Sequence, residues 1–229
     1  MEKDRSSKII AVVALLVGVV GLSLGFAAFS NTLTISSGAT VRPDATTFNV
    51  DFSSTKDTLA TEAIEPTTTP SGLTASNGAI NNTGDPTITN LSVEFSAPGQ
   101  SATYTFFARN EGEYDAFLNS IAFANAAGAD SYKKCEATAN DEGNVTANAD
   151  LVAAACNAIS LSVKVGTEAA TKQSVADIDN HTLAKGVGEE IVVVIDYAAT
   201  VDGDDSARAD GPFKVTFGDI TLAYGSVDN

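Results

Sequence analysis

The sequence predicts an all-β protein folded as an antiparallel β-sandwich, with one short helix and an N-terminal hydrophobic helix. Three observations lead to this prediction. Apolar and polar residues alternate in several separate segments, which places every second side chain on one face of a strand. Turn-forming residues separate these segments. The chain has 229 residues and 44% hydrophobic content, enough for one domain with a sizeable core.

The N-terminal segment directs the chain to a membrane. Residues 9–29 carry no charge and follow three basic residues, as in a secretory signal. Gly25 and Ala27 are the small side chains that a signal peptidase needs before a cut between Ala27 and Ala28. The apolar stretch is also long enough to span a bilayer. Residues 1–27 are therefore predicted to be a cleaved signal peptide or, alternatively, a retained membrane anchor.

Residues 28–41 are predicted to form an N-terminal strand directly after the cut. Phe29, Leu33 and Ile35 fall on one face of this extended segment. A terminal strand with such an apolar stripe is either paired in its own sheet or inserted into the sheet of another molecule. The residues alone leave both arrangements open. While the signal is attached, the membrane holds this segment, and cleavage frees it.

Residues 42–229 are predicted to form a single sandwich domain. The run from Ile191 to Ile195 is apolar on both faces and rich in β-branched residues, which favours a central strand covered on each side. The other strands are predicted from alternating apolar residues in residues 48–52, 91–95, 102–108, 159–165, 213–217 and 220–224.

The segments between the strands contain turn and loop signals. Residues 53–86 are rich in Ser, Thr, Pro, Gly and Asn, which predicts a long surface excursion or loop. Pro98 and Gly99 suit a type II turn, because Pro fixes φ at the second position and Gly accepts a positive φ at the third. Residues 110–112, Asn-Glu-Gly, suit the next bend.

A short helix is predicted at residues 151–156, because this segment is rich in alanine and Asn148 or Asp150 can cap it. The helix should pack over one end of the sandwich. Its last residue is Cys156, and Cys135 is the other cysteine of the chain. In an exported protein an isolated pair favours a disulfide over two free thiols or a metal site.

The composition argues against nucleic acid as a partner and against catalysis. The chain has 29 acidic and 13 basic residues, whereas phosphate binding needs clustered cations. Its single histidine, His181, lies in a polar turn, where we expect it to be solvated. No zinc-protease, phosphate-loop or dinucleotide motif occurs. The sequence therefore predicts a protein that is not an enzyme.

One acidic segment raises the question of calcium. Carboxylates at short spacing around glycines can surround Ca²⁺ with oxygen ligands, although the spacing here differs from that of an EF-hand. We favour a solvated hairpin loop and predict no other cofactor or metal. The weak calcium candidates are Asp202, Asp204, Asp205 and Asp210.

Two parts of the chain resemble the TasA and camelysin family of exported biofilm-matrix proteins. The first is the predicted mature start, residues 28–31 (Ala-Phe-Ser-Asn), directly after an apolar signal. The second has residues 98–100 (Pro-Gly-Gln), then Phe106, then residues 110–112 (Asn-Glu-Gly), in that family's order of turn, strand and bend. The similarity covers the signal junction and roughly residues 95–124.

The resemblance implies a jelly-roll subunit that polymerises outside the cell by donor-strand exchange. The expected function is a secreted structural subunit of an extracellular fibre, located outside the cell or at its surface. Its partners would be other copies of itself, head to tail, together with a signal peptidase and, before cleavage, the membrane. The alternative is a membrane-anchored monomeric surface domain that acts as an adhesin or ligand-binding module. Camelysin's association with metalloprotease activity is not carried over, because no position matches a zinc-protease motif.

Overall fold

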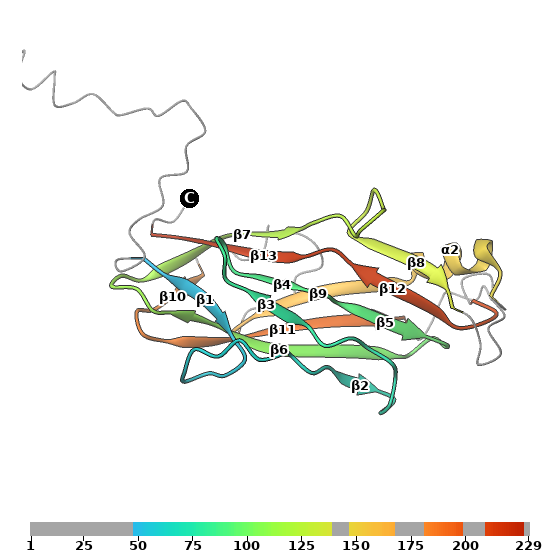
Figure 1. Cartoon of the computed structure of the whole chain (residues 1–229), viewed down its shortest axis with the longest axis horizontal. Coiled ribbons are helices and arrows are strands. Elements are labelled where there is room, and N and C mark those ends of the chain that lie inside the picture. The colour runs from blue at the N-terminus through green and yellow to red at the C-terminus, as the bar shows by residue number, and fades with distance from the viewer. Residues whose placement is uncertain (1–47, 139–146, 168–180, 199–208, 227–229) are drawn as a thin grey trace, which may run out of the picture. The chain divides into compact units, whose positions relative to one another are not determined.

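The computed structural model describes residues 48–138, 147–167, 181–198 and 209–226. These residues belong to one compact unit, Pro43–Asn229, and they are mostly β, with antiparallel sheets and one short helix among them (Figure 1). The predicted all-β class is thus confirmed, and the arrangement is consistent with a sandwich. The predicted signal or anchor, residues 1–27, and N-terminal strand, residues 28–41, lie outside the described residues.

The strands form three sheets whose pairs are all antiparallel. The first sheet has the order β1-β6-β11-β9, with β2 also paired to β6. Its strands are β1 (Val50–Ser53), β2 (Thr67–Thr69), β6 (Ser101–Asn110), β9 (Ile159–Val165) and β11 (Gly188–Tyr197).

The second and third sheets lie end to end, because the chain runs directly from β12 of the third sheet into β13 of the second. Their orders are β10-β7-β13-β4-β3 and β5-β12-β8. Backbone hydrogen bonds, such as that from Gly218 N–H to Tyr132 O at 2.8 Å, continue the pairing between them. Their strands are β3 (Ala79–Asn81), β4 (Thr87–Thr89), β5 (Ser92–Phe95), β7 (Ala116–Phe123), β8 (Lys133–Ala137), β10 (Thr182–Leu183), β12 (Phe213–Phe217) and β13 (Ile220–Gly225).

The core is built from the alternating apolar residues, and aromatic rings fill much of it. Phe95, Tyr197 and Phe213 contact one another, with ring centroids 5.6 to 6.1 Å apart. Tyr104 is fully buried, and its hydroxyl donates to Ser76 O at 2.8 Å. Burial raises the pKa of Tyr104 to about 12, despite this hydrogen bond. The phenol therefore acts as a neutral donor that joins β6 to the loop before β3.

Strand β11 lies between β6 and β9, which confirms the central position predicted for the run at residues 191–195. The expectation that both of its faces would be covered is only partly correct. Ile191, Val193 and Ile195 are fully buried, whereas Val192 and Val194 are half-buried. The β-branched residues on the outer face thus serve strand propensity more than core packing.

The segment 53–86 is more ordered than predicted. It contains β2 and β3, and Ile64 pairs with Gly78 in an isolated bridge. The Asn82 side chain accepts from Phe52 N–H at 2.8 Å and donates to Phe52 O at 2.9 Å. The Asn82 side chain therefore makes the two hydrogen bonds that the backbone of a neighbouring strand would make. It joins the β3 side of the second sheet to β1. This side of the two sheets is closed by hydrogen bonds.

The predicted turns and helix are confirmed. Gly99 has a φ of 83°, as a type II turn requires, and Gly112 N–H donates to Asn110 Oδ1 at 3.0 Å. Helix α2 (Ala149–Asn157) begins after Asn148, whose side chain accepts from Asp150 N–H at 2.8 Å. The helix lies beside β8 at one end of the domain (Figure 1).

Candidate functional site

Among the described residues, strand β9 has a partner strand on one side only. Gly166 N–H donates to Glu190 O at 2.8 Å, and Ala198 N–H donates to Ala158 O at 3.2 Å. Because both bonds run between even-numbered residues, the even-numbered residues of β9 face β11. The backbone groups of Leu161, Val163 and Val165 therefore point away from β11, and no backbone partner for them lies in the described ranges. We call this side the β9 edge.

Strand β7 forms an edge on the same side of the two sheets. Leu118 N–H donates to His181 O at 3.0 Å, and β10 pairs only with the first two residues of β7. Beyond that point, β7 has no partner on this side within the described residues. A register shift between Ala223 and Tyr224 of β13 places a bulge in the pairing with β7. Bulges of this kind bend an edge strand and interrupt its pairing.

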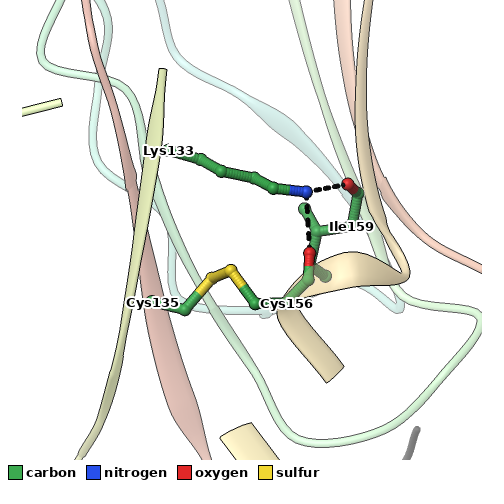
Figure 2. The surroundings of a disulfide bond; sticks show 4 residues. All are labelled: Lys133, Cys135, Cys156 and Ile159. Carbon is green, nitrogen blue, oxygen red and sulfur yellow. Dashed lines mark hydrogen bonds between the residues drawn. A yellow bond between two sulfur atoms is a disulfide. The ribbon is translucent and has the colours of Figure 1, made fainter. Parts of the chain in front are cut away.

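One end of the β9 edge is fixed by a disulfide and a lysine (Figure 2). Cys135 on β8 and Cys156 on α2 form a disulfide with their Cα atoms 6.0 Å apart, which confirms the predicted pair. Lys133 Nζ donates to Cys156 O at 2.7 Å and to Ile159 O at 2.6 Å. Ile159 is the first residue of β9, and its carbonyl points away from β11. Lys133 therefore satisfies the carbonyl at this end of the β9 edge. Burial lowers the pKa of Lys133.

Replacing Lys133 by methionine should destabilise the domain by about 1–3 kcal/mol, because two partly buried carbonyls lose a charged donor. Lys134→Met is the matched control, since Lys134 makes an exposed ion pair with Glu136 at 2.9 Å, and such pairs contribute about 0–1 kcal/mol. Urea unfolding of both variants measures the difference. Equal losses would show that the two carbonyls do not depend on Lys133.

At the other end of β9, the Glu189 side chain of β11 lies beside Gly166 and contacts His181. The Nε2 of His181 lies 2.5 Å from Glu189 Oε2, and the histidine side chain is only 9% exposed. The expectation of a solvated histidine is therefore wrong, because Glu189 points inward from β11 and meets the ring. Tyr224 is also buried here, and its hydroxyl has no partner among the described residues. Burial, and secondarily the charge of Glu189, raise the pKa of Tyr224.

The candidate residues named from the sequence have different outcomes. Asp210 Oδ1 accepts from Asn148 N–H at 2.7 Å, so this carboxylate supports the start of α2. Within the described ranges, no group of three or more His, Cys, Asp or Glu side chains is placed to hold a metal. The remaining residues lie outside the described part: Gly25, Ala27, Ala28, Phe29, Leu33, Ile35, Asp202, Asp204 and Asp205.

The sequence did not reveal Lys133 or the β9 edge. Strand β8 has the sequence Lys-Lys-Cys-Glu-Ala, which alternates too weakly to be recognised as a strand. The proximity of Cys135, two residues after Lys133, was the one signal available for that site. The edge position of β9 depends on strand order, which alternation does not encode.

The disulfide indicates that the chain folds in an oxidising environment. Across the described ranges, no helix is long and apolar enough to cross a membrane. No protein-family model, curated protein or solved structure matches this chain.

Proposed function

We propose that the protein is an exported structural subunit of an extracellular fibre. In this proposal, residues 28–41 of one copy pair with the β9 edge of the next copy and complete a jelly-roll-like fold. The single observation that carries the proposal is the row of backbone groups at Leu161, Val163 and Val165, which have no partner in the described ranges. An unpaired row of this kind is a template for another strand.

The dimensions of the β9 edge suit the N-terminal strand. From Ile159 to Val165 the edge is about 20 Å long, at about 3.3 Å per residue. The segment from Phe29 to Ile35 has the same number of residues. Its side chains alternate, so pairing with β9 would turn Phe29, Leu33 and Ile35 together toward one face.

Contacts near both ends of β9 limit where an added strand can pair. Lys133 binds the Ile159 carbonyl at one end, and Glu189, which contacts His181, lies beside Gly166 at the other end. An added strand would lie between these two contacts. A strand that leaves one copy and pairs with another makes a head-to-tail contact, which generates a filament when it does not close into a ring.

The oxidising environment that the disulfide indicates supports the same proposal. A disulfide forms in oxidising environments, as outside the cell, and the predicted signal would carry the chain there. The formal net charge of −16 makes close packing of like subunits depend on salt. The proposal therefore includes an extracellular or cell-surface location and a role without catalysis.

The proposal is tested on protein recovered from the surface of producing cells. N-terminal sequencing should give a start at Ala28, and negative-stain microscopy of the same material should show filaments. Deletion of residues 28–37 should abolish the filaments and leave a folded monomer, because this segment lies outside the compact unit Pro43–Asn229. Filaments that persist after the deletion would refute strand donation. A retained N-terminus without filaments would favour the membrane-anchored surface domain instead.

A further inference from the structure

Three large apolar side chains remain exposed at one end of the domain. The exposed fractions are 48% for Leu59, 63% for Tyr114 and 45% for Val187. They are the large hydrophobic residues that stay exposed within the described ranges. Each lies on a loop, and the loops come from different parts of the chain. We call these three residues the exit face, because the described chain begins beside the loops that carry them.

The loops that carry Tyr114 and Val187 meet at Asn110. Asn110 N–H donates to Val187 O at 3.1 Å, and Gly186 N–H donates to Asn110 O at 2.9 Å. The Asn110 side chain donates to Tyr114 O at 2.8 Å. Asn110 is fully buried, so the two loops share one buried polar anchor. Tyr114 and Val187 are thereby held near each other.

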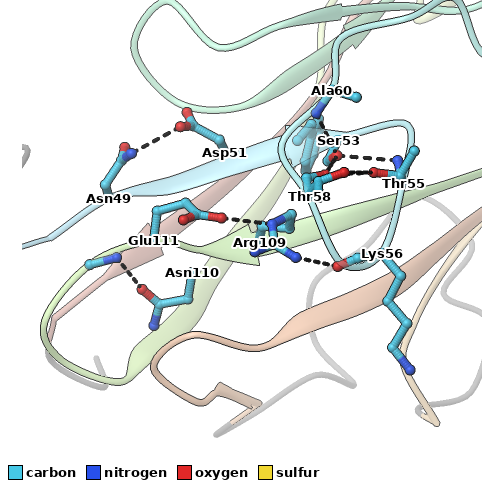
Figure 3. A network of polar contacts seen from close by, with 12 residues as sticks. Asn49, Asp51, Ser53, Thr55, Lys56, Thr58, Ala60, Arg109, Asn110 and Glu111 are labelled. Carbon is cyan, nitrogen blue, oxygen red and sulfur yellow. Dashed lines mark hydrogen bonds and ion pairs between the residues drawn. The ribbon is translucent and has the colours of Figure 1, made fainter.

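The loop that carries Leu59 reaches the same place (Figure 3). Arg109 Nη1 donates to Lys56 O, and Arg109 precedes Asn110 in β6. Ser53 Oγ donates to Thr58 O at 2.7 Å and accepts from Ala60 N–H at 3.0 Å. The loop is therefore ordered by its own hydrogen bonds, and binding a partner would cost little additional conformational entropy.

The described part of the chain begins beside these loops. Glu111 N–H donates to Asn49 O at 2.9 Å, so the start of the described chain lies next to the loop of Tyr114. With residues 29–35 paired to the β9 edge, residues 36–47 connect the donor strand to this point. At 3.3–3.6 Å per residue, these twelve residues span at most about 43 Å. The copy that holds the donor strand is therefore tethered to the end of the domain that carries the exit face.

We infer that the exit face packs against a second copy of this chain, the copy whose β9 edge receives residues 28–41. This inference rests on the proposed function and adds a second contact to it. A tyrosine amid aliphatic side chains is typical of the centre of a protein interface, with polar groups at the rim. Here the rim includes the ion pair between Lys185 and Glu113, at 3.1 Å.

The test compares two double variants of the exported chain. Tyr114→Ser with Val187→Ser should raise the critical concentration for filament growth at least about tenfold, because loss of a buried interface aromatic commonly has such an effect. Ala124→Ser with Ala127→Ser is the control, because these exposed residues lie between β7 and β8. The control should polymerise like the unchanged chain.

Two further measurements separate the possible outcomes. A synthetic peptide of residues 28–41 should bind the chain that lacks these residues equally well with and without the Tyr114 and Val187 changes. The thermal midpoint of that shortened chain should also stay the same, because both side chains are exposed.

Polymerisation of the Tyr114 and Val187 variant at an unchanged critical concentration would overturn the inference and leave strand donation standing. Loss of peptide binding or of thermal stability in this variant would also overturn it, because the residues would then act within the fold or the β9 edge. If the unchanged chain neither polymerises nor binds the peptide, the proposed function fails together with the inference.

Discussion

Replacing Val163 by proline should abolish filament formation and leave the monomeric domain folded. The Val163 N–H points away from β11, so the monomer loses no ladder hydrogen bond when proline removes it. Proline is tolerated in edge strands at such positions. A donor strand, in contrast, needs that N–H and cannot approach the proline ring. Negative-stain microscopy and thermal unfolding of the same preparation measure both effects.

The neighbouring residue provides the control. The alternation places the backbone of Ser162 toward Val194 of β11. Ser162→Pro should therefore remove a ladder hydrogen bond and destabilise the monomer more than Val163→Pro does. If Val163→Pro still forms normal filaments, residues 28–41 do not pair with the β9 edge. Val163 is fully buried, so Val163→Ala, which keeps the N–H, measures the loss of packing separately and should still form filaments.

Removal of the disulfide should cause the largest loss of stability. Cys135 and Cys156 are 21 residues apart in sequence, and closing a loop of this length contributes about 3 kcal/mol in the chain-entropy model. For a domain of this size, the double change to serine should lower the thermal midpoint by roughly 6–12 °C. Differential scanning calorimetry measures the change.

Two comparisons test the cause of this loss. The unchanged protein after reduction should unfold at nearly the same temperature as the double serine variant, because both lack the same bond. Single serine variants should match the double variant, since either one breaks the bridge. An unchanged midpoint in the double variant would show that Lys133 and core packing alone hold α2 in place.

The strands that sequence analysis identified are those whose inner faces build the core. In residues 102–108 and 159–165 the apolar side chains alternate without interruption, and they lie in β6 and β9. The short helix was equally accessible, because Asn148 is a strong capping residue and alanines follow it. In these segments the local pattern and the tertiary fold agree.

Local features of the sequence explain why some strands were not predicted. Strand β7 contains a bulge that shifts the alternation between Leu118 and Ile121, so no regular period is visible. Strands β2 and β3 have three residues each and lie in a segment of turn-forming composition. Their pairing depends on distant contacts, such as that between Asn82 and Phe52, which a local pattern cannot encode.

One half of the proposed site was predicted from the sequence, and the other half was found only in the structure. The donor residues Phe29, Leu33 and Ile35 were named from the sequence alone and lie outside the described residues. The proposed acceptor emerged only from strand order and hydrogen-bond direction in β9. The contact of His181 with Glu189 was likewise hidden, because it joins the start of β10 to an inward-facing residue of β11.

Hydrogen exchange at β9 tests strand donation most directly. In a monomer without residues 28–41, the amides of Ser160, Ser162 and Lys164 should be protected by β11, whereas those of Leu161, Val163 and Val165 should exchange rapidly. In filaments of the exported chain, both sets should be protected. Rapid exchange at Leu161, Val163 and Val165 within intact filaments would contradict the account, because no strand would then occupy the β9 edge.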